Sequence, residues 1–143
     1  MIRILTERIK VNSAENCGIT NITGLVSDKI SKLGFISGNV TIFMGGSTGG
    51  VTTIEYEPGL LQDLPELLER LIPSDIAYQH DKTWGDGNGF SHLRSALIGP
   101  SLTVPFDERK LLLGTWQQII AVNFDNRPRT REIILQIIGE DNG

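Results

Sequence analysis

The chain has 143 residues, the size of one domain that buries about two thirds of its unfolded surface. Its composition is 39% hydrophobic and 21% charged, as in ordinary globular proteins, and a net charge of −4 argues against a nucleic-acid-binding protein. The single cysteine, Cys17, excludes an intrachain disulfide framework, and the sequence has no signal peptide or membrane-length apolar run. We therefore expect one domain over residues 1–143, located in the cytoplasm, with no nucleic-acid or membrane partner.

The first half of the chain predicts strands separated by two main helices. Residues 2–11 mix apolar and charged side chains as a half-buried strand does, and residues 38–44 and 51–55 predict two further strands. A helix is predicted over residues 20–33, with Thr20 or Asn21 as its N-cap.

The second predicted helix begins at Pro58 and runs toward Leu71, with its leucines directed inward. Pro65 lies within it and is expected to kink or restart the helix, because proline has no amide hydrogen to donate.

The second half of the chain predicts strands and little helix. The predicted strands cover residues 93–98, 101–104, 111–116, 117–124 and 132–138. Trp116, at the end of a leucine-rich strand, is expected in the core or in a subunit interface. This order of elements predicts an α+β fold in which a mostly antiparallel sheet packs on two main helices.

The glycine-rich loop at residues 45–50 follows a predicted strand directly. Two glycine pairs surround Ser47 and Thr48, so backbone amides and hydroxyls could bind an anion there. The loop lacks the lysine and the spacing of a P-loop, and a glycine-rich bulge or turn explains the same residues.

The segment from Tyr78 to Trp116 contains both histidines and both tryptophans of the chain. His80, Asp86, Asn88 and His92 form the candidate constellation. These side chains could hold Mg²⁺ if the oxygens dominate, or Zn²⁺ if the imidazoles do. Alternatively, Asp86 and Asn88 form turns with their own backbone and His92 is a core residue.

Several of these residues resemble one known family. The motifs Tyr-Gln-His at 78–80, Asp-Gly-Asn at 86–88, Ser-His-Leu at 91–93, Gly-Pro-Ser at 99–101 and Leu-Leu-Leu-Gly-Thr-Trp-Gln at 111–117 are similar to those of the secondary thiamine-phosphate synthase family, the YjbQ-type proteins. Thr48, Glu55, Asp63, Leu64, Arg127 and Arg129 also fall where that family has matching residues.

The resemblance implies a β-sandwich or barrel-like α+β fold that assembles as a homotrimer. It implies a reaction that joins a hydroxymethylpyrimidine diphosphate to a thiazole phosphate and releases pyrophosphate. Two positions depart from the family pattern, because this chain has Gly46 and Phe90 where family members commonly carry histidines. Two of four expected site imidazoles are therefore absent.

The roles that follow are expectations. His80, His92 and Asp86 are the catalytic candidates, and Ser47, Thr48, Glu55, Asn88 and Arg94 are the substrate-binding candidates, with Mg²⁺ or Zn²⁺ as a possible cofactor of His80, Asp86, Asn88 and His92. Arg127, Arg129 and Arg131 form a basic turn that could meet phosphate or make salt bridges.

Three functions fit these residues. The first is a thiamine-phosphate synthase-type enzyme acting on a small phosphorylated substrate. The others are a metal-assisted phosphate-ester hydrolase and a trimeric ligand-binding protein without turnover.

Overall fold

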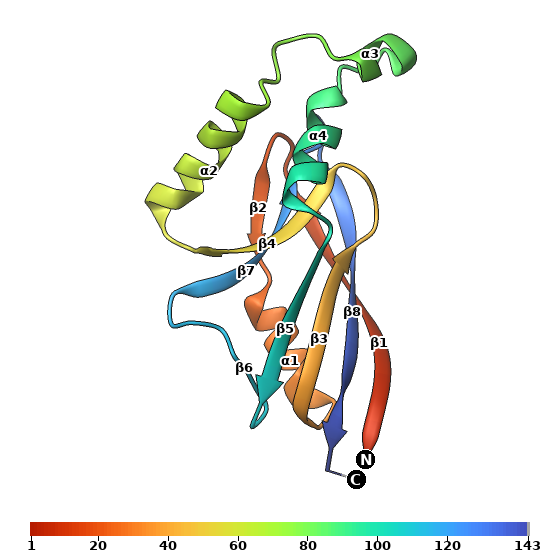
Figure 1. The fold of residues 1–143 in the computed structure, drawn as a ribbon, viewed down its shortest axis with the longest axis vertical. Coiled ribbons are helices and arrows are strands. Elements are labelled where there is room, and N and C mark those ends of the chain that lie inside the picture. Colours follow the sequence, from red (N-terminus) through yellow and green to blue (C-terminus); the bar gives the residue numbers. More distant parts are fainter. Residues whose placement is uncertain (143) are drawn as a thin grey trace.

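A computed structural model describes residues 1–142, which form two sheets and several helices (Figure 1). The strands are β1 (Ile2–Ser13), β2 (Gly18–Asn21), β3 (Phe35–Met44), β4 (Gly49–Glu55), β5 (Ser101–Asp107), β6 (Lys110–Leu111), β7 (Gln117–Asn123) and β8 (Arg129–Asp141). The helices are α1 (Thr23–Lys32), α2 (Pro58–Leu71), α3 (Gln79–Trp84) and α4 (Gly89–Ile98). Among these residues, no helix is long and apolar enough to cross a membrane.

The strand pairing confirms the predicted α+β fold. The larger sheet has the order β1-β8-β3-β5-β6 and the smaller sheet has the order β2-β7-β4. All of these pairs are antiparallel. The two main predicted helices are present as α1 and α2, and α3 and α4 are additional.

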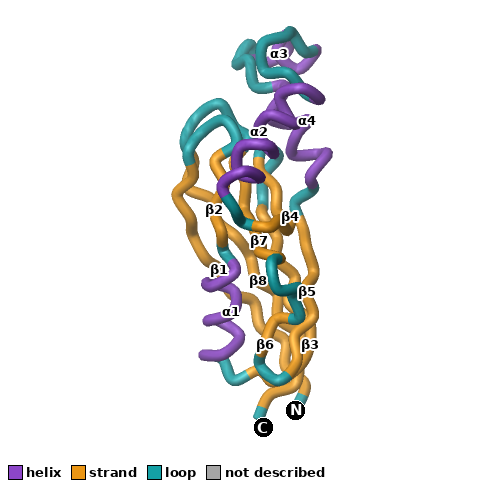
Figure 2. The backbone as a smooth tube through the Cα atoms, turned by 90° about the vertical axis from the view of Figure 1, so that its left-hand side faces the viewer, coloured by secondary structure: helices purple, strands orange, loops and turns teal. Residues whose placement is uncertain are grey.

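The long β1–β8 ladder sets the position of the candidate site. It runs from the pair Ile2 and Glu140 at one end to the pair Ser13 and Arg129 at the other. Both termini lie at the first end, and α3 and α4 lie at the opposite end of the molecule (Figures 1 and 2). The start of β8 is therefore close to the helices that carry the two histidines.

Strand β7 is buried on both faces, which explains its nearly continuous apolar sequence. Ile119 and Ala121 belong to the core shared with the larger sheet and α1. Ile120 and Val122 belong to a second cluster with Leu68 of α2 and Ile98 of α4. The smaller sheet is thus the middle layer between the larger sheet and these two helices.

Helix α1 is shorter at its start than predicted. Residues 18–21 pair with β7 as β2, so the helix begins at Thr23 and not at Thr20. The N-cap is Ile22, so the predicted N-cap at Thr20 or Asn21 is wrong; Asn21 Oδ1 instead accepts a hydrogen bond from Thr23 N at 3.0 Å, as in an Asx-turn. Val26 and Ile30 are buried as their spacing predicts.

Helix α2 differs from prediction in two respects. It continues through Pro65 as one element, so the expected restart is wrong. Of its leucines only Leu68 is buried, whereas Leu67 and Leu71 are 42% and 60% exposed. No other element of the described chain covers the outer face of α2, so the leucines on that face stay exposed.

The predicted strand at 93–98 is wrong, because these residues belong to α4. Its buried face carries Phe90, Ser91, Arg94 and Ser95, while Leu93 and Leu97 are exposed. The buried residues of α4 follow helical spacing, but several of them are polar, and the leucines lie on the exposed face. The distribution of apolar residues in the sequence therefore did not reveal this helix. The predicted strand at 111–116 is also wrong, since β6 ends at Leu111.

Candidate functional site

Three segments enclose one polar cavity of about 420 Å³. They are the glycine-rich loop between β3 and β4, the start of α4 with the residues before it, and the segment from β7 into β8. We call this cavity the polar pocket; its lining comprises Gly46, Ser47, Thr48, Asp86, Asn88, His92, Asp125, Asn126, Arg127, Arg129 and Arg131.

Arginines at alternate positions form one wall of the polar pocket. Arg129 and Arg131 lie two residues apart in β8 and so point to the same side, and Arg127, in the bend before β8, lines the same cavity. Arg127 is 66% exposed and Arg129 is 37% exposed, whereas Arg131 is buried. Asp86 and Asp125 supply two opposing charges, so the lining has a positive surplus that favours an anion.

Asp125 lies beneath the arginines in the protein interior and holds two neighbouring groups of the pocket in place. The carboxylate is fully buried and accepts hydrogen bonds from Arg129 Nη2 at 2.9 Å and from Thr48 Oγ1 at 3.0 Å. Burial alone would raise the pKa of Asp125, but the hydrogen bonds from Arg129 and Thr48 outweigh it and the pKa lies below the ordinary aspartate value. Asp125 is therefore an ionised support that fixes Arg129 and the loop.

Arg131 fixes the other side of Thr48. Its Nη2 donates to Thr48 Oγ1 at 2.8 Å and to Asn123 Oδ1 at 2.5 Å. Its Nε is buried and has no hydrogen-bond partner among residues 1–142. The Thr48 hydroxyl is thus occupied within the protein, and the exposed Ser47 is the residue of this pair that is open to the polar pocket.

Asn88 holds the start of α4 against the segment after β7. It is buried, and its Oδ1 accepts hydrogen bonds from Asn126 N at 3.2 Å and from the Ser91 hydroxyl. Ser91 Oγ also lies 2.6 Å from Phe124 O. The Asn88 side-chain oxygen thus serves the packing of α4, and its expected role as a metal ligand stays a prediction.

The two histidines lie together as the candidate constellation requires. His80 of α3 and His92 of α4 have ring centroids 4.3 Å apart and planes inclined by 39°. His92 lines the polar pocket, and Asp86 lines it as well. His80 is stacked behind His92, with its Nδ1 3.6 Å from Asp86 Oδ1.

Two predicted substrate-binding residues lie elsewhere. Glu55 ends β4 and lines a separate cavity of about 390 Å³ with Tyr56 and Trp116. Trp116 is 72% exposed, so it does not lie in the core of this chain, and the alternative of a subunit interface stays a prediction.

Arg94 is 3% exposed and faces α2, where its Nη2 donates to Glu69 Oε2 at 2.7 Å and to Ile72 O at 2.8 Å. Its guanidinium group joins two helices and does not reach the polar pocket.

The two departures from the family pattern have different structural consequences. Gly46 lines the polar pocket, and a Cβ built there would meet only Arg131 Nη1, at 3.5 Å. Phe90 is buried beside Cys17 and Arg94 in another cavity. A histidine at position 90 would therefore not enter the polar pocket in this arrangement, so only one expected imidazole is missing from it.

Sequence reasoning missed Asp125, Asn126 and the part that Asp81 plays beside His80. Asp125 directly follows a buried strand and precedes three arginines at alternate positions. An acidic residue between an apolar strand and a series of arginines was the signal available in the sequence.

Comparison with known proteins gives the relatives of this chain. A family model described as "UPF0047 protein YjbQ-like" matches residues 7–140. A "UPF0047 protein" of Archaeoglobus fulgidus is 35% identical over 91% of this chain and 98% of the relative. Another from Methanothermobacter thermautotrophicus is 32% identical over 97% and 95%.

Solved structures show the same fold. A YbjQ-like protein of unknown function from Sulfolobus solfataricus superposes with a TM-score of 0.91 at 28% identity, covering 98% of this chain and 100% of that one. The hypothetical protein APE1520 from Aeropyrum pernix gives 0.87 at 29% identity, covering 95% and 99%.

Proposed function

The chain belongs to the UPF0047 YjbQ-like family, and we propose that it is an enzyme of the thiamine-phosphate synthase type whose polar pocket binds a small phosphorylated substrate. The observation that carries this proposal is the wall of three arginines facing His92 and Ser47. A diphosphate needs concentrated positive charge and hydrogen-bond donors, and guanidinium groups supply both.

The proposed reaction forms one bond and breaks one. The thiazole ring nitrogen donates its electron pair to the methylene carbon of the pyrimidine, while the carbon–oxygen bond to the diphosphate breaks and pyrophosphate leaves with that bond's electron pair. The nitrogen becomes quaternary and loses no proton. The enzyme's main tasks are therefore to stabilise the leaving pyrophosphate and to align the two rings.

The residues divide these tasks by position. Arg127 and Arg129 face the opening and would neutralise the leaving group, with Asp125 holding Arg129 in place. Ser47 would donate a hydrogen bond to a phosphate oxygen. His92, which lines the polar pocket together with Asp86, would donate a proton to the departing pyrophosphate.

Turnover with two variants tests the proposal. Wild-type protein would be given the pyrimidine diphosphate and the thiazole phosphate, and both the coupled product and released pyrophosphate would be measured. We expect His92→Ala to lower the rate by about 100-fold, the range for a lost general acid, while substrate still binds. Arg127→Gln should weaken substrate binding, and Arg8→Gln, in a surface ion pair with Glu132, serves as the matched control.

The outcomes separate the candidate functions. Coupled product that depends on His92 supports the synthase-type reaction. Release of phosphate without a coupled product would instead indicate a hydrolase. Tight binding with neither product would indicate a ligand-binding protein, and an unchanged rate in His92→Ala would remove His92 from catalysis.

A further inference from the structure

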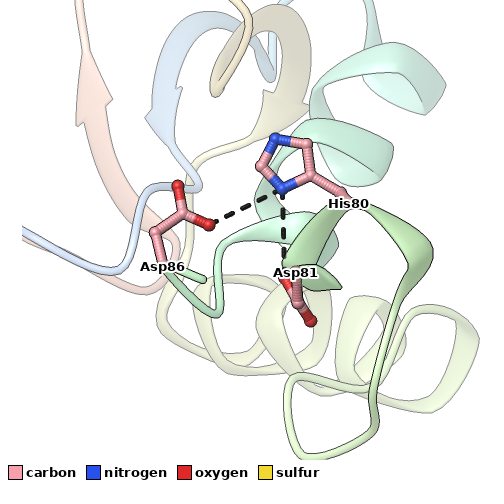
Figure 3. A group of neighbouring side chains, drawn as sticks. All are labelled: His80, Asp81 and Asp86. Atoms are coloured by element: carbon pink, nitrogen blue, oxygen red, sulfur yellow. Dashed lines mark ion pairs between the residues drawn. The ribbon is translucent and has the colours of Figure 1, made fainter. Parts of the chain in front are cut away.

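A second group of polar side chains lies beside the polar pocket. His80, Asp81 and Asp86 face one another, as Figure 3 shows. His80 Nδ1 lies 3.6 Å from Asp86 Oδ1 and 3.9 Å from Asp81 Oδ1, and one potential ligand atom from each residue lies within 4.8 Å of the others. We propose that these three residues, the cation triad, bind a divalent cation of the zinc class.

The types of the ligand atoms, together with their separations, favour one class of cation. With bonds of about 2.0–2.2 Å, neighbouring ligands lie about 3.4 Å apart around a tetrahedral ion and about 3.0 Å apart around an octahedral one. The two measured separations, 3.6 and 3.9 Å, are nearer to the tetrahedral value. One imidazole nitrogen with two carboxylate oxygens is also a ligand set that Zn²⁺ accepts, whereas Mg²⁺ strongly prefers oxygen.

The backbone holds both carboxylates in position. Asp81 Oδ1 accepts a hydrogen bond from Gly89 N at 2.9 Å, and Asp81 Oδ2 accepts one from Tyr78 N at 3.1 Å. These two bonds fix the orientation of the Asp81 carboxylate beside His80. Each carboxylate oxygen has a second lone pair, so these bonds leave capacity for a cation.

The turn after α3 returns Asp86 toward His80. Gly85 has the left-handed φ of +66°, which ends the helix and reverses the chain. Asp86 Oδ1 accepts a hydrogen bond from Asn88 N at 3.2 Å, which orients its carboxylate. Hydrogen bonds of this kind behind the ligands are what metal sites use to orient them.

His80 Nδ1 is the atom on which both carboxylates converge. It is buried and makes no hydrogen bond to any of residues 1–142, although two carboxylates flank it. Neither carboxylate is at hydrogen-bond distance from this nitrogen, and a cation between the three groups would bind all of them.

The cation triad and the polar pocket share Asp86. A cation held there would lie beside the arginine wall, where it would add positive charge next to a bound phosphate. The triad stands on its own geometry, and its failure would leave the proposal of a phosphate-binding pocket in place.

Metal titration tests the cation triad. Chelator-treated protein would be titrated with Zn²⁺ by calorimetry and with Co²⁺ by visible absorption, which reports coordination number. We expect one strongly coloured tetrahedral Co²⁺ site per chain. His80→Gln and Asp86→Asn should each raise the Kd for Zn²⁺ at least about tenfold, since even the loss of an outer-shell partner costs that much. Asp75→Asn, which changes an exposed aspartate in the preceding segment, is the matched control.

Thermal unfolding of each variant would establish that it is folded, and pyrophosphate binding would be measured separately in the presence of chelator. Zn²⁺ affinity that both triad variants retain would overturn the proposal, as would a wild-type Kd above about 1 mM. A weakly coloured octahedral Co²⁺ spectrum with preference for Mg²⁺ would overturn the zinc class. Loss of Zn²⁺ binding in His80→Gln with pyrophosphate binding intact supports the triad, because His80 does not line the polar pocket.

Discussion

At the scale of single residues, the pocket depends on one carboxylate that no ligand needs to touch. Asp125 is fully buried and joins Arg129 to Thr48, so it fixes a basic side chain and the glycine-rich loop together. Its environment favours the charged form, and the folded protein therefore holds this group ionised at a lower pH than the unfolded chain does.

Asp125→Asn is expected to lower the free energy of unfolding by about 2 kcal/mol at pH 7, because hydrogen bonds to charged groups are lost. Since the folded-state pKa of Asp125 is depressed, the contribution is present above the unfolded-state pKa of about 4 and is lost as pH falls through the folded-state pKa. Denaturant unfolding of the wild type and the variant from pH 7 to pH 3 measures this. A stability difference that is equally large at pH 7 and at pH 3 would contradict it.

Arg94 gives a second prediction at this scale, because its sequence suggested a substrate ligand and its contacts show a brace between helices. Arg94→Gln should destabilise the fold by about 2–3 kcal/mol, since Glu69 and Ile72 O lose a buried charged donor. The affinity of the Arg94→Gln variant for pyrophosphate, measured by calorimetry, should stay within about twofold of the wild-type value. A large loss of affinity in a stably folded variant would restore Arg94 to the binding site.

At the scale of elements, the glycine-rich loop combines two separate requirements. A Cβ on Gly50 would lie 2.9 Å from Ile98 Cγ2 and 3.0 Å from Gly99 O, so this glycine lets β4 approach α4 closely. Gly45 has open space around its Cβ position. The glycines inside β4 thus serve packing, and the residues before β4 serve the pocket.

The pair Gly50→Ala and Gly45→Ala tests that division. Gly50→Ala is expected to destabilise the protein by about 1–3 kcal/mol, as overpacking does, and Gly45→Ala should change stability by no more than about 0.5 kcal/mol. Thermal or denaturant unfolding measures both. Equal effects of the two substitutions would show that the loop's flexibility and not its packing is what matters.

The same elements show what the sequence could predict. Apolar periodicity identified α1, α2 and most strands, although in α2 only Leu68 of the apolar face is buried. It failed for α4, where Ser91 and Arg94 are buried through hydrogen bonds that only the tertiary structure supplies. His80, Asp86 and His92 were found because their residue types are unusual together. Asp125 was missed, because its signal is its place between an apolar strand and three alternating arginines and not an unusual residue type.

At the scale of the whole molecule, the described chain leaves several large apolar side chains open to solvent. Leu93 and Leu97 on α4 are 48% and 58% exposed, and Leu71 and Trp116 are more exposed still. Exposed apolar patches in a soluble protein commonly mark contact surfaces. Together with the family resemblance, this favours an assembly of identical chains.

We therefore expect sedimentation equilibrium to give three times the chain mass of 15.7 kDa. The double substitution Leu93→Ser and Leu97→Ser should shift the protein toward the monomer, because it removes apolar surface beside the pocket. Leu25→Ser on α1, nearer the other end of the molecule, is the control (Figure 1). A wild-type protein that sediments as a monomer at all concentrations would contradict the expectation.

The central claim is that the polar pocket binds the phosphate groups of a small substrate. The most direct measurement is the change in backbone amide NMR signals when inorganic pyrophosphate is added to chelator-treated protein. The account predicts saturable shifts confined to residues 46–50, 86–92 and 125–131, and predicts that Arg127→Gln weakens them. Shifts that centre on Glu55 and Trp116, or no saturable shifts at all, would contradict it.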